Sequence, residues 1–326
     1  MGQGLKSEIM EIGIGSAGDR KMHPPQRIDE SRGLVYNPFA SYPISERAIL
    51  PTVHPSWRAI VEERNAIRRH PVIAFYVLAF ALSWLGWIPQ ALHARGLFPL
   101  NNPLFNLLGG IGPTLAAVIV ILMLREQDGL RNLFGPLFKW RASPWWYLFA
   151  LGFWFFATGI ALGIGTIFGQ TFPALSQFPW GILPPIFIAM LFSNVWEEVG
   201  WRGFALPRLQ EKYGDGQIVL IMGLLWSLWH VPLLLNPSSP MSGLPWYGEI
   251  TFSLSLTVIY TWLYLNTSRS LLFVSVFHAT SNAIAFALLE VGAFTSSYVF
   301  VVGVTAIFAA ALMLIHGPQR LIRLPR

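Results

Sequence analysis

Two adjacent carboxylates, Glu197 and Glu198, end an apolar run that begins at Ile182 and contains no charged residue before them. Arg202 follows Glu198 by four residues, a spacing that puts both side chains on one helical face in ion-pairing register. Glu197 lies about 100° further round the helix, so the same arginine does not neutralise both acids. We therefore expect Glu198 and Arg202 to form a structural pair and Glu197 to act as a general base.

Two later apolar segments carry one histidine each, His230 and His278. Trp226 precedes His230 by one helical turn and can pack on its ring. Asn282 follows His278 at the same spacing, so the amide and the imidazole share a face. Such a pair can donate hydrogen bonds to the oxyanion of a hydrolysed carbonyl, or equally ligate a metal. Ionisable groups at membrane depth usually mark a working site, and this set indicates proton-transfer chemistry on water.

The elements that position these residues are predicted to be transmembrane helices. The chain is 54% hydrophobic and only 12% charged, about half the charged fraction of a soluble domain. Runs of about 20 apolar residues predict eight spans. We place them at 71–93, 104–124, 145–168, 183–206, 217–236, 247–265, 271–289 and 294–316. The expected fold is an all-α membrane protein, a bundle of about eight transmembrane helices behind a polar cytoplasmic N-terminal tail.

The basic residues give this bundle an orientation. With the N-terminus in the cytoplasm, fifteen of the sixteen Lys and Arg outside residues 1–54 fall on the cytoplasmic side and only Arg95 on the other, as the positive-inside rule expects. We therefore predict a multi-pass protein of the cell membrane with both termini cytoplasmic. Counting about 1.5 Å per residue along the helices puts Glu197, His230 and His278 in one layer near the cytoplasmic side. We expect water and a polypeptide to reach them from the cytosol.

Three segments are expected along the chain. Residues 1–70 are polar, lack the apolar segment of a signal peptide, and predict a disordered cytoplasmic tail. Residues 71–316 form the transmembrane domain, with the motifs in 180–290, and residues 317–326 form a short basic cytoplasmic tail. The absence of cysteine excludes disulfides and thiolate sites. The basic residues are spread over separate segments, which argues against nucleic acid as a partner.

Three motifs in this chain resemble those of one family. Residues 197–202 read EEVGWR and fit the EExxxR signature of the CAAX prenyl protease and bacteriocin-processing family, the type II CAAX protease-like or Abi-domain intramembrane endopeptidases. Residues 226–230 read WSLWH and look like the second motif, with Trp226 where phenylalanine is usual. Residues 278–282 read HATSN and fit the third motif, HxxxN. The resemblance covers roughly 180–290 directly and the bundle by implication.

The resemblance implies an intramembrane endopeptidase that cuts a membrane-associated or small peptide substrate, with or without a lipid modification. Its partners would be that peptide or protein and the lipid bilayer. The implied site consists of Glu197, which activates a water with help from His230; His278 and Asn282, which stabilise the oxyanion; and Glu198, Arg202 and Trp226, which support them. No cofactor is favoured, because the residues do not form an HExxH arrangement. A divalent metal such as zinc, if present, would be held by His230, His278 and Glu197.

Two other classes of function stay open on the sequence. A catalytically silent adaptor or scaffold could keep every motif residue as a buried ion network between helices. A proton-coupled transporter could use the same carboxylates and imidazoles. Transport is disfavoured, because the ionisable groups cluster in one layer instead of forming a chain across the membrane.

Overall fold

The computed structural model describes residues 67–317 and Leu321, and this part of the chain is helical without strands. The tails expected at 1–70 and 317–326 therefore lie almost wholly outside the described residues. The helices are α2 (Pro71–His93), α3 (Pro103–Leu124), α4 (Gly129–Phe134), α5 (Pro144–Ile167), α6 (Leu183–Glu198), α7 (Leu206–Gln210), α8 (Asp215–Trp229), α9 (Val231–Leu234), α10 (Trp246–Asn266), α11 (Leu271–Glu290) and α12 (Phe294–His316). A π-helix, Val199–Ala205, joins α6 to α7.

Each of the eight predicted spans coincides with a helix or with consecutive helices, and the all-α membrane fold is confirmed. In the described part six helical segments are long and apolar enough to cross a membrane: α2, α3, α5, Trp180–Gln210, α11 and α12. The count of eight spans is not confirmed. Helix α8 is 15 residues long, and α10 carries Glu249 among several serines and threonines.

Local sequence explains where several of these helices begin. Proline opens α2, α3 and α5, a position where its missing N–H leaves no hydrogen bond unmade. The side chain of Asn102 caps α3 by accepting a 2.9 Å hydrogen bond from the Leu104 amide. Proline and a polar cap therefore fix the first residues of spans that hydropathy locates.

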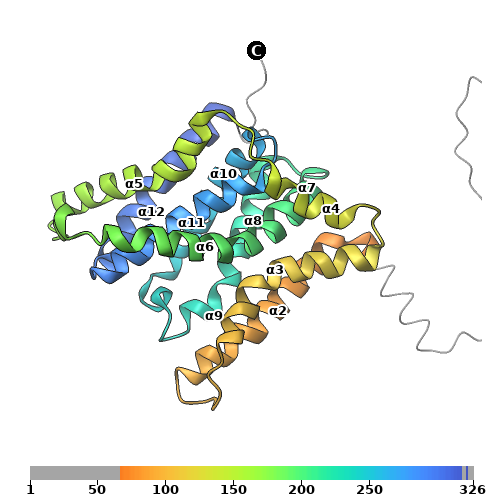
Figure 1. Ribbon diagram of the computed structural model, residues 1–326, viewed down its shortest axis with the longest axis horizontal. Helices are drawn as coiled ribbons and strands as arrows, with labels where there is room; N and C mark the ends of the chain where they lie inside the picture. Colours follow the sequence, from red (N-terminus) through yellow and green to blue (C-terminus); the bar gives the residue numbers. More distant parts are fainter. Residues whose placement is uncertain (1–66, 318–320, 322–326) are drawn as a thin grey trace, which may run out of the picture. The chain divides into compact units, whose positions relative to one another are not determined.

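The helices pack in pairs around the segment that holds the motifs. Helix α2 packs on α3, α6 on α11, and α8 on α10, while α12 contacts both α10 and α5. In Figure 1, α6 and α11 run through the middle of the described helices, with α2 and α3 on one side and α5 and α12 on the other. The first motif, which begins on α6, and the third, on α11, thus lie on neighbouring central helices, and the second lies at the end of α8, which packs on α10.

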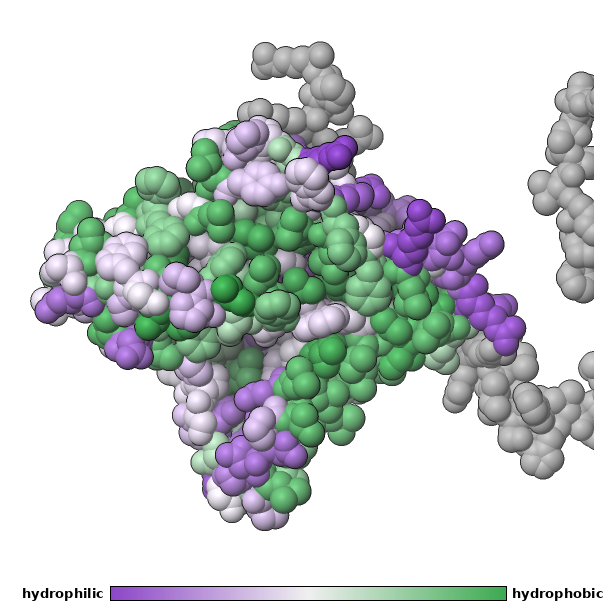
Figure 2. All heavy atoms as spheres, viewed as in Figure 1, coloured by the Kyte–Doolittle hydropathy of each residue, from purple (hydrophilic) through white to green (hydrophobic). Residues whose placement is uncertain are grey.

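The described helices have two polar ends and an apolar middle. Figure 2 shows apolar surface along α2 and α3, with polar side chains near α4 and α7 and around the α2–α3 connection. We call the first end the basic end, because Lys139, Arg208 and Arg269 lie there. The other, the opposite end, holds the connections 94–102 and 235–245 and, among described Lys and Arg, Arg95 alone. Large apolar side chains exposed between the ends, such as Leu107 and Phe156, suit contact with lipid.

Candidate active site

The two glutamates lie where α6 passes into the π-helix. Glu198 is the last residue of α6, and Arg202 lies within Val199–Ala205. π-Helical turns are rare and are frequent at functional sites. Gly200 brings this turn against α3: a Cβ added there would lie 2.5 Å from Cβ of Pro113 and 2.7 Å from its carbonyl oxygen. The sequence pattern did not reveal the π-helix.

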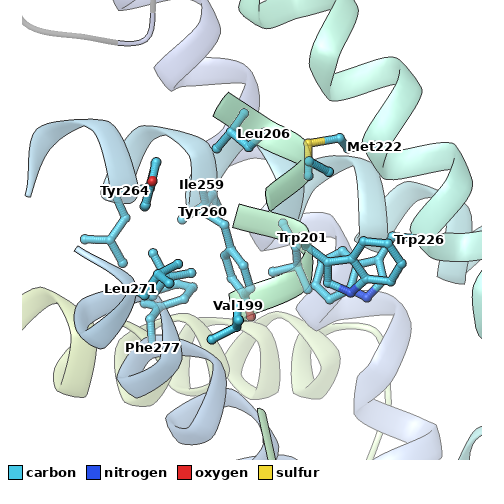
Figure 3. Close-up of a cluster of buried hydrophobic side chains, with 14 of the residues drawn as sticks. Val199, Trp201, Leu206, Met222, Trp226, Ile259, Tyr260, Tyr264, Leu271 and Phe277 are labelled. Atoms are coloured by element: carbon cyan, nitrogen blue, oxygen red, sulfur yellow. The ribbon is translucent and has the colours of Figure 1, made fainter. Parts of the chain in front are cut away.

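Glu198 and Arg202 form the ion pair that their spacing predicts. Nη1 of Arg202 lies 3.1 Å from Oε2 and 3.2 Å from Oε1 of Glu198, and both side chains are fully buried. The guanidinium also lies 4.6 Å from the ring centre of Trp226 and 4.5 Å from that of Tyr260. Cation–π contacts of this kind stabilise a desolvated arginine. Figure 3 shows Tyr260 and Trp226 among the buried side chains around the π-helix.

Glu198 has a second partner on α11. Nδ1 of His278 lies 2.9 Å from Oε1 of Glu198, and His278 is buried. The carboxylate therefore links the first and third motifs directly. Helical periodicity places Glu198 and His278 on their own helices but does not say which faces meet, so the sequence did not predict this contact.

His230 is held by a carboxylate that the sequence analysis missed. Its Nδ1 lies 2.9 Å from Oε1 of Glu249, in the first turn of α10. Glu249 is buried, and its Oε1 also accepts a 2.8 Å hydrogen bond from Oγ of Ser253. The hydroxyl of Tyr298 lies 3.5 Å from Oε2. The sequence contained a signal for this residue, because Glu249 is an acid inside a predicted span. The same reasoning singled out Glu197.

The aromatic neighbour predicted for His230 is present. Trp226 lies with its ring centre 5.8 Å from that of His230 and also 5.8 Å from that of His278. One indole therefore contacts both imidazoles, whereas its spacing predicted contact with His230 alone. Trp226 separates the two rings and limits the orientations open to each.

The two carboxylate–imidazole pairs set the proton positions on both rings. A carboxylate only accepts hydrogen bonds, so Nδ1 of His230 and of His278 carries the proton toward its glutamate. In the neutral ring Nε2 is then unprotonated and can accept a proton or bind a cation. Donation to an oxyanion, the role that the resemblance implies for His278, requires the doubly protonated ring.

Glu197, His230, His278 and Asn282 line one cavity of about 670 Å³. Oε2 of Glu197 is buried and has no hydrogen-bond partner among the described residues. A buried carboxylate oxygen without a protein partner is placed to bind water. The amide of Asn282 donates a 3.3 Å hydrogen bond to Oδ1 of Asn194. The shared cavity thus brings together Glu197, His230, His278 and Asn282, the four residues that the resemblance implied as catalytic.

The cavity extends toward the opposite end of the helices. Its lining includes His93 and Asn101 beside the α2–α3 connection, and Asn236 and Met241 after α9. Toward the basic end the site is closed by the buried layer of Arg202, Trp201, Trp226 and Tyr260. The expectation of access from the basic end is therefore not met. Counting residues along a helix predicts the depth of a side chain in the membrane. It does not predict at which end of the helices large side chains close the cavity.

His230, His278 and Glu197 are the residues expected to hold a divalent metal, if one binds. Among the described residues, no group of three or more His, Cys, Asp or Glu side chains is arranged to hold a metal ion. Both histidines nevertheless present Nδ1 to a carboxylate, an arrangement that also orients histidines toward metals.

Comparison with known proteins confirms the resemblance seen in the motifs. Residues 179–284 match the family model of the type II CAAX prenyl endopeptidase Rce1-like proteins. The chain is also 26% identical over 222 residues to CAAX prenyl protease 2 of Methanococcus maripaludis, a match covering 64% of this chain and 81% of the relative. The family match contains all three motifs. These similarities support an intramembrane protease.

Proposed function

We propose that this chain, which over residues 179–284 matches the family model of the type II CAAX prenyl endopeptidase Rce1-like proteins, hydrolyses a peptide bond with a water activated by Glu197. The observation that carries the proposal is Oε2 of Glu197, which has no hydrogen-bond partner in the described part of the chain and shares one cavity with two imidazoles that are each fixed by a carboxylate. A base, a proton acceptor and polar donors in a cavity within an apolar bundle are what peptide hydrolysis requires.

Glu197 takes a proton from the water that attacks the scissile carbonyl. Its neighbour Glu198 cannot do so, because that carboxylate is occupied by Arg202 and His278. The two acids thus divide into one that reacts and one that binds two groups, Arg202 and His278. A positioned general base contributes about 10²–10⁴-fold to a rate.

His230 assists as a second proton carrier. With its Nδ1 proton directed to Glu249, its Nε2 can accept the proton that Glu197 has taken from the water and deliver it to the leaving amine. Glu249 acts through His230 as a positioning residue, because it fixes the ring orientation and the tautomer. Ser253 and Trp229, whose ring centre lies 5.0 Å from that of His230, hold this pair in place.

His278 and Asn282 stabilise the negative charge that forms on the carbonyl oxygen. With Nδ1 of His278 directed to Glu198, the doubly protonated ring has a proton on Nε2 to donate. The side-chain amide of Asn282 supplies a second donor by leaving Asn194. Two donors directed at a developing oxyanion are the usual arrangement in acyl transfer.

The substrate is a peptide that carries apolar groups. The cavity lining combines the amides of Asn101, Asn194 and Asn236 with the apolar side chains of Phe252 and Leu256. The named relative is a CAAX prenyl protease, so a C-terminal peptide with an isoprenoid thioether is the first substrate to try. The same peptide without the isoprenoid tests whether the lipid is required.

The integral membrane location follows from the apolar helices, and the positive-inside rule assigns the basic end and both termini to the cytoplasm. Access to the catalytic cavity would then be from the other side, because its lining reaches the opposite end.

The deciding experiment is cleavage of the two peptides by the full chain in liposomes, with products identified by mass spectrometry. Wild type should cleave at least one peptide, and Glu197→Ala should not. Glu290→Ala, at an exposed acid that ends α11 and lines neither the catalytic cavity nor the cavity at the basic end, is the matched control and should retain full activity. Equal results for wild type and Glu197→Ala, with or without cleavage, would contradict the proposal, and no cleavage by either would favour the adaptor.

A further inference from the structure

A second cavity, which we call the basic cavity, lies at the basic end, away from the catalytic residues. It has a volume of about 900 Å³ and is lined by Arg68, Lys139, Arg208, Lys212, Arg269, Glu126 and Glu211 among other residues. Five cations thus face two acids, a net charge of +3 with His70 neutral. The proposed hydrolysis uses none of these side chains.

Part of this positive charge is already neutralised and part is not. Arg208 is bound to Glu126 through two contacts of Nη2, at 2.6 and 2.7 Å. Lys139 donates to the carbonyl of Ser268 at 3.0 Å. The side chains of Arg68, Lys212 and Arg269 have no hydrogen-bond or ion-pair partner within the described part of the chain. Three cations without such a partner among the described residues, from three separate segments, therefore line one cavity.

The position of Arg269 depends on a strained backbone conformation. Ser268 and Arg269 both have positive φ, 57° and 59°, in the connection between α10 and α11. Two consecutive non-glycine residues in this region are uncommon, and such outliers gather at functional sites. The turn gives Arg269 its place in the cavity lining.

The rest of the lining is apolar and belongs to the ends of spans. Val72 and Ile73 come from the first turn of α2, Leu124 from the last residue of α3, and Leu225 from α8. Ile73 is 61% exposed. A cavity that joins cations to aliphatic walls at the level where spans end fits a lipid headgroup with its first methylenes better than a soluble ion. Tyr76 also lines it and has a buried hydroxyl without a partner among the described residues.

We propose that the basic cavity binds an anionic phospholipid, with the headgroup phosphate held by Arg269, Lys212 and Arg68 and the acyl chains against Val72 and Ile73. The cavity also touches Gly203, next to Arg202 in the π-helix. A bound lipid therefore packs on the segment that ends at the catalytic site and should stabilise the folded chain.

The test is the thermal unfolding midpoint of the full chain in detergent with added phosphatidylglycerol, phosphatidylcholine or inorganic phosphate. Phosphatidylglycerol should raise the midpoint by several degrees more than phosphatidylcholine, and native mass spectrometry should show it retained. Inorganic phosphate should not reproduce the shift. Equal effects of the two lipids on the wild-type chain would overturn the proposal, and a full effect of phosphate would replace the lipid by a soluble anion.

The variants localise the site. Arg269→Ala combined with Lys212→Ala should weaken phosphatidylglycerol binding about 30-fold, because removing each cation from the headgroup weakens binding several-fold. Arg125→Ala combined with Arg131→Ala removes the same charge from exposed positions at the same end that do not line the cavity, and binding should be retained. Equal weakening in both double variants would show diffuse surface charge instead of a site.

Discussion

Oε1 of Glu249 and Nδ1 of His230 lie 2.9 Å apart, joining the start of α10 to the end of α8. This contact gives the second motif a carboxylate partner, as Glu198 does for the third. The two histidines of the site are therefore fixed in the same way, by two acids on different helices.

Replacing Glu249 should lower turnover without unfolding the protein. Glu249→Gln keeps the shape but can hold the wrong tautomer of His230, so we expect kcat to fall about 10–100-fold while KM changes little. Steady-state kinetics on the cleaved peptide measures this split. Glu249→Asp should recover part of kcat, because the carboxylate is kept.

Ser253→Ala is the matched control for Glu249. It removes one hydrogen bond to the same carboxylate and leaves His230 with its partner, so kcat should stay within a few-fold of wild type. A loss in Glu249→Gln that follows thermal stability, with no recovery in Glu249→Asp, would reduce Glu249 to a packing residue.

Substitutions of Glu197 and of Arg202 should affect activity and stability differently. Glu197→Gln replaces an acid whose buried Oε2 has no hydrogen-bond partner among the described residues, so cleavage should be lost while the thermal midpoint in detergent is kept or raised. Arg202→Ala leaves Glu198 buried without its cation and removes two aromatic contacts, a loss of about 3–5 kcal/mol. Thermal unfolding of both variants should differ clearly, and equal midpoints would show that the two acids do not have separate roles.

Gly200 should not tolerate a side chain. Gly200→Ala would place Cβ 2.6 Å from the carbonyl carbon of Pro113, which neither backbone can relieve, so we expect a loss of at least about 1–3 kcal/mol. Gly110→Ala is the control, because a Cβ there meets nothing within 4 Å although the residue lines the catalytic cavity. The yield of folded protein by size-exclusion chromatography compares them, and equal yields would be the contrary result.

Chelation should leave cleavage unchanged. The proposed chemistry uses Glu197 as base and His278 with Asn282 as donors, so removal of divalent metal should not affect the rate. Elemental analysis should give less than one equivalent of zinc per chain, and strong chelators should be without effect. Stoichiometric zinc, with activity lost on chelation and restored by zinc, would move His230, His278 and Glu197 to the role of ligands.

The orientation can be measured by single-cysteine labelling, because the chain contains no cysteine. Leu97→Cys reports on the opposite end and Arg141→Cys on the basic end, and both positions are exposed. A membrane-impermeant maleimide added to intact cells should label Leu97→Cys and reach Arg141→Cys only after permeabilisation. The reverse pattern would place the catalytic cavity on the cytoplasmic side.

The sequence predicted those parts of the site that depend on spacing within one helix. The Glu198–Arg202 pair and the contact of Trp226 with His230 are four-residue relationships and are present. The positions of the helices followed from the runs of apolar residues. The partner of His230 was not predicted, because Glu249 comes from another helix and helical periodicity does not say which faces meet.

Two further features depend on packing that no local pattern encodes. The π-helix has a backbone geometry that apolar periodicity cannot distinguish from an α-helix over one turn. The direction of the cavity depends on where Trp201 and Tyr260 fill space, not on depth along a helix. Predicting either the π-helix or the direction of the cavity from the sequence would have required knowing which side chains pack around Arg202.

The layer around Arg202 also concerns the membrane as an electrical barrier. A water-filled cavity that enters from one end carries protons part of the way across the bilayer, and a continuous wire of water would discharge the ion gradient of the cell. Arg202, paired with Glu198 and in contact with the rings of Trp226 and Tyr260, puts a buried ion pair and two rings where such a wire would have to pass. We therefore expect the enzyme to admit water to its catalytic residues while the membrane stays tight to protons.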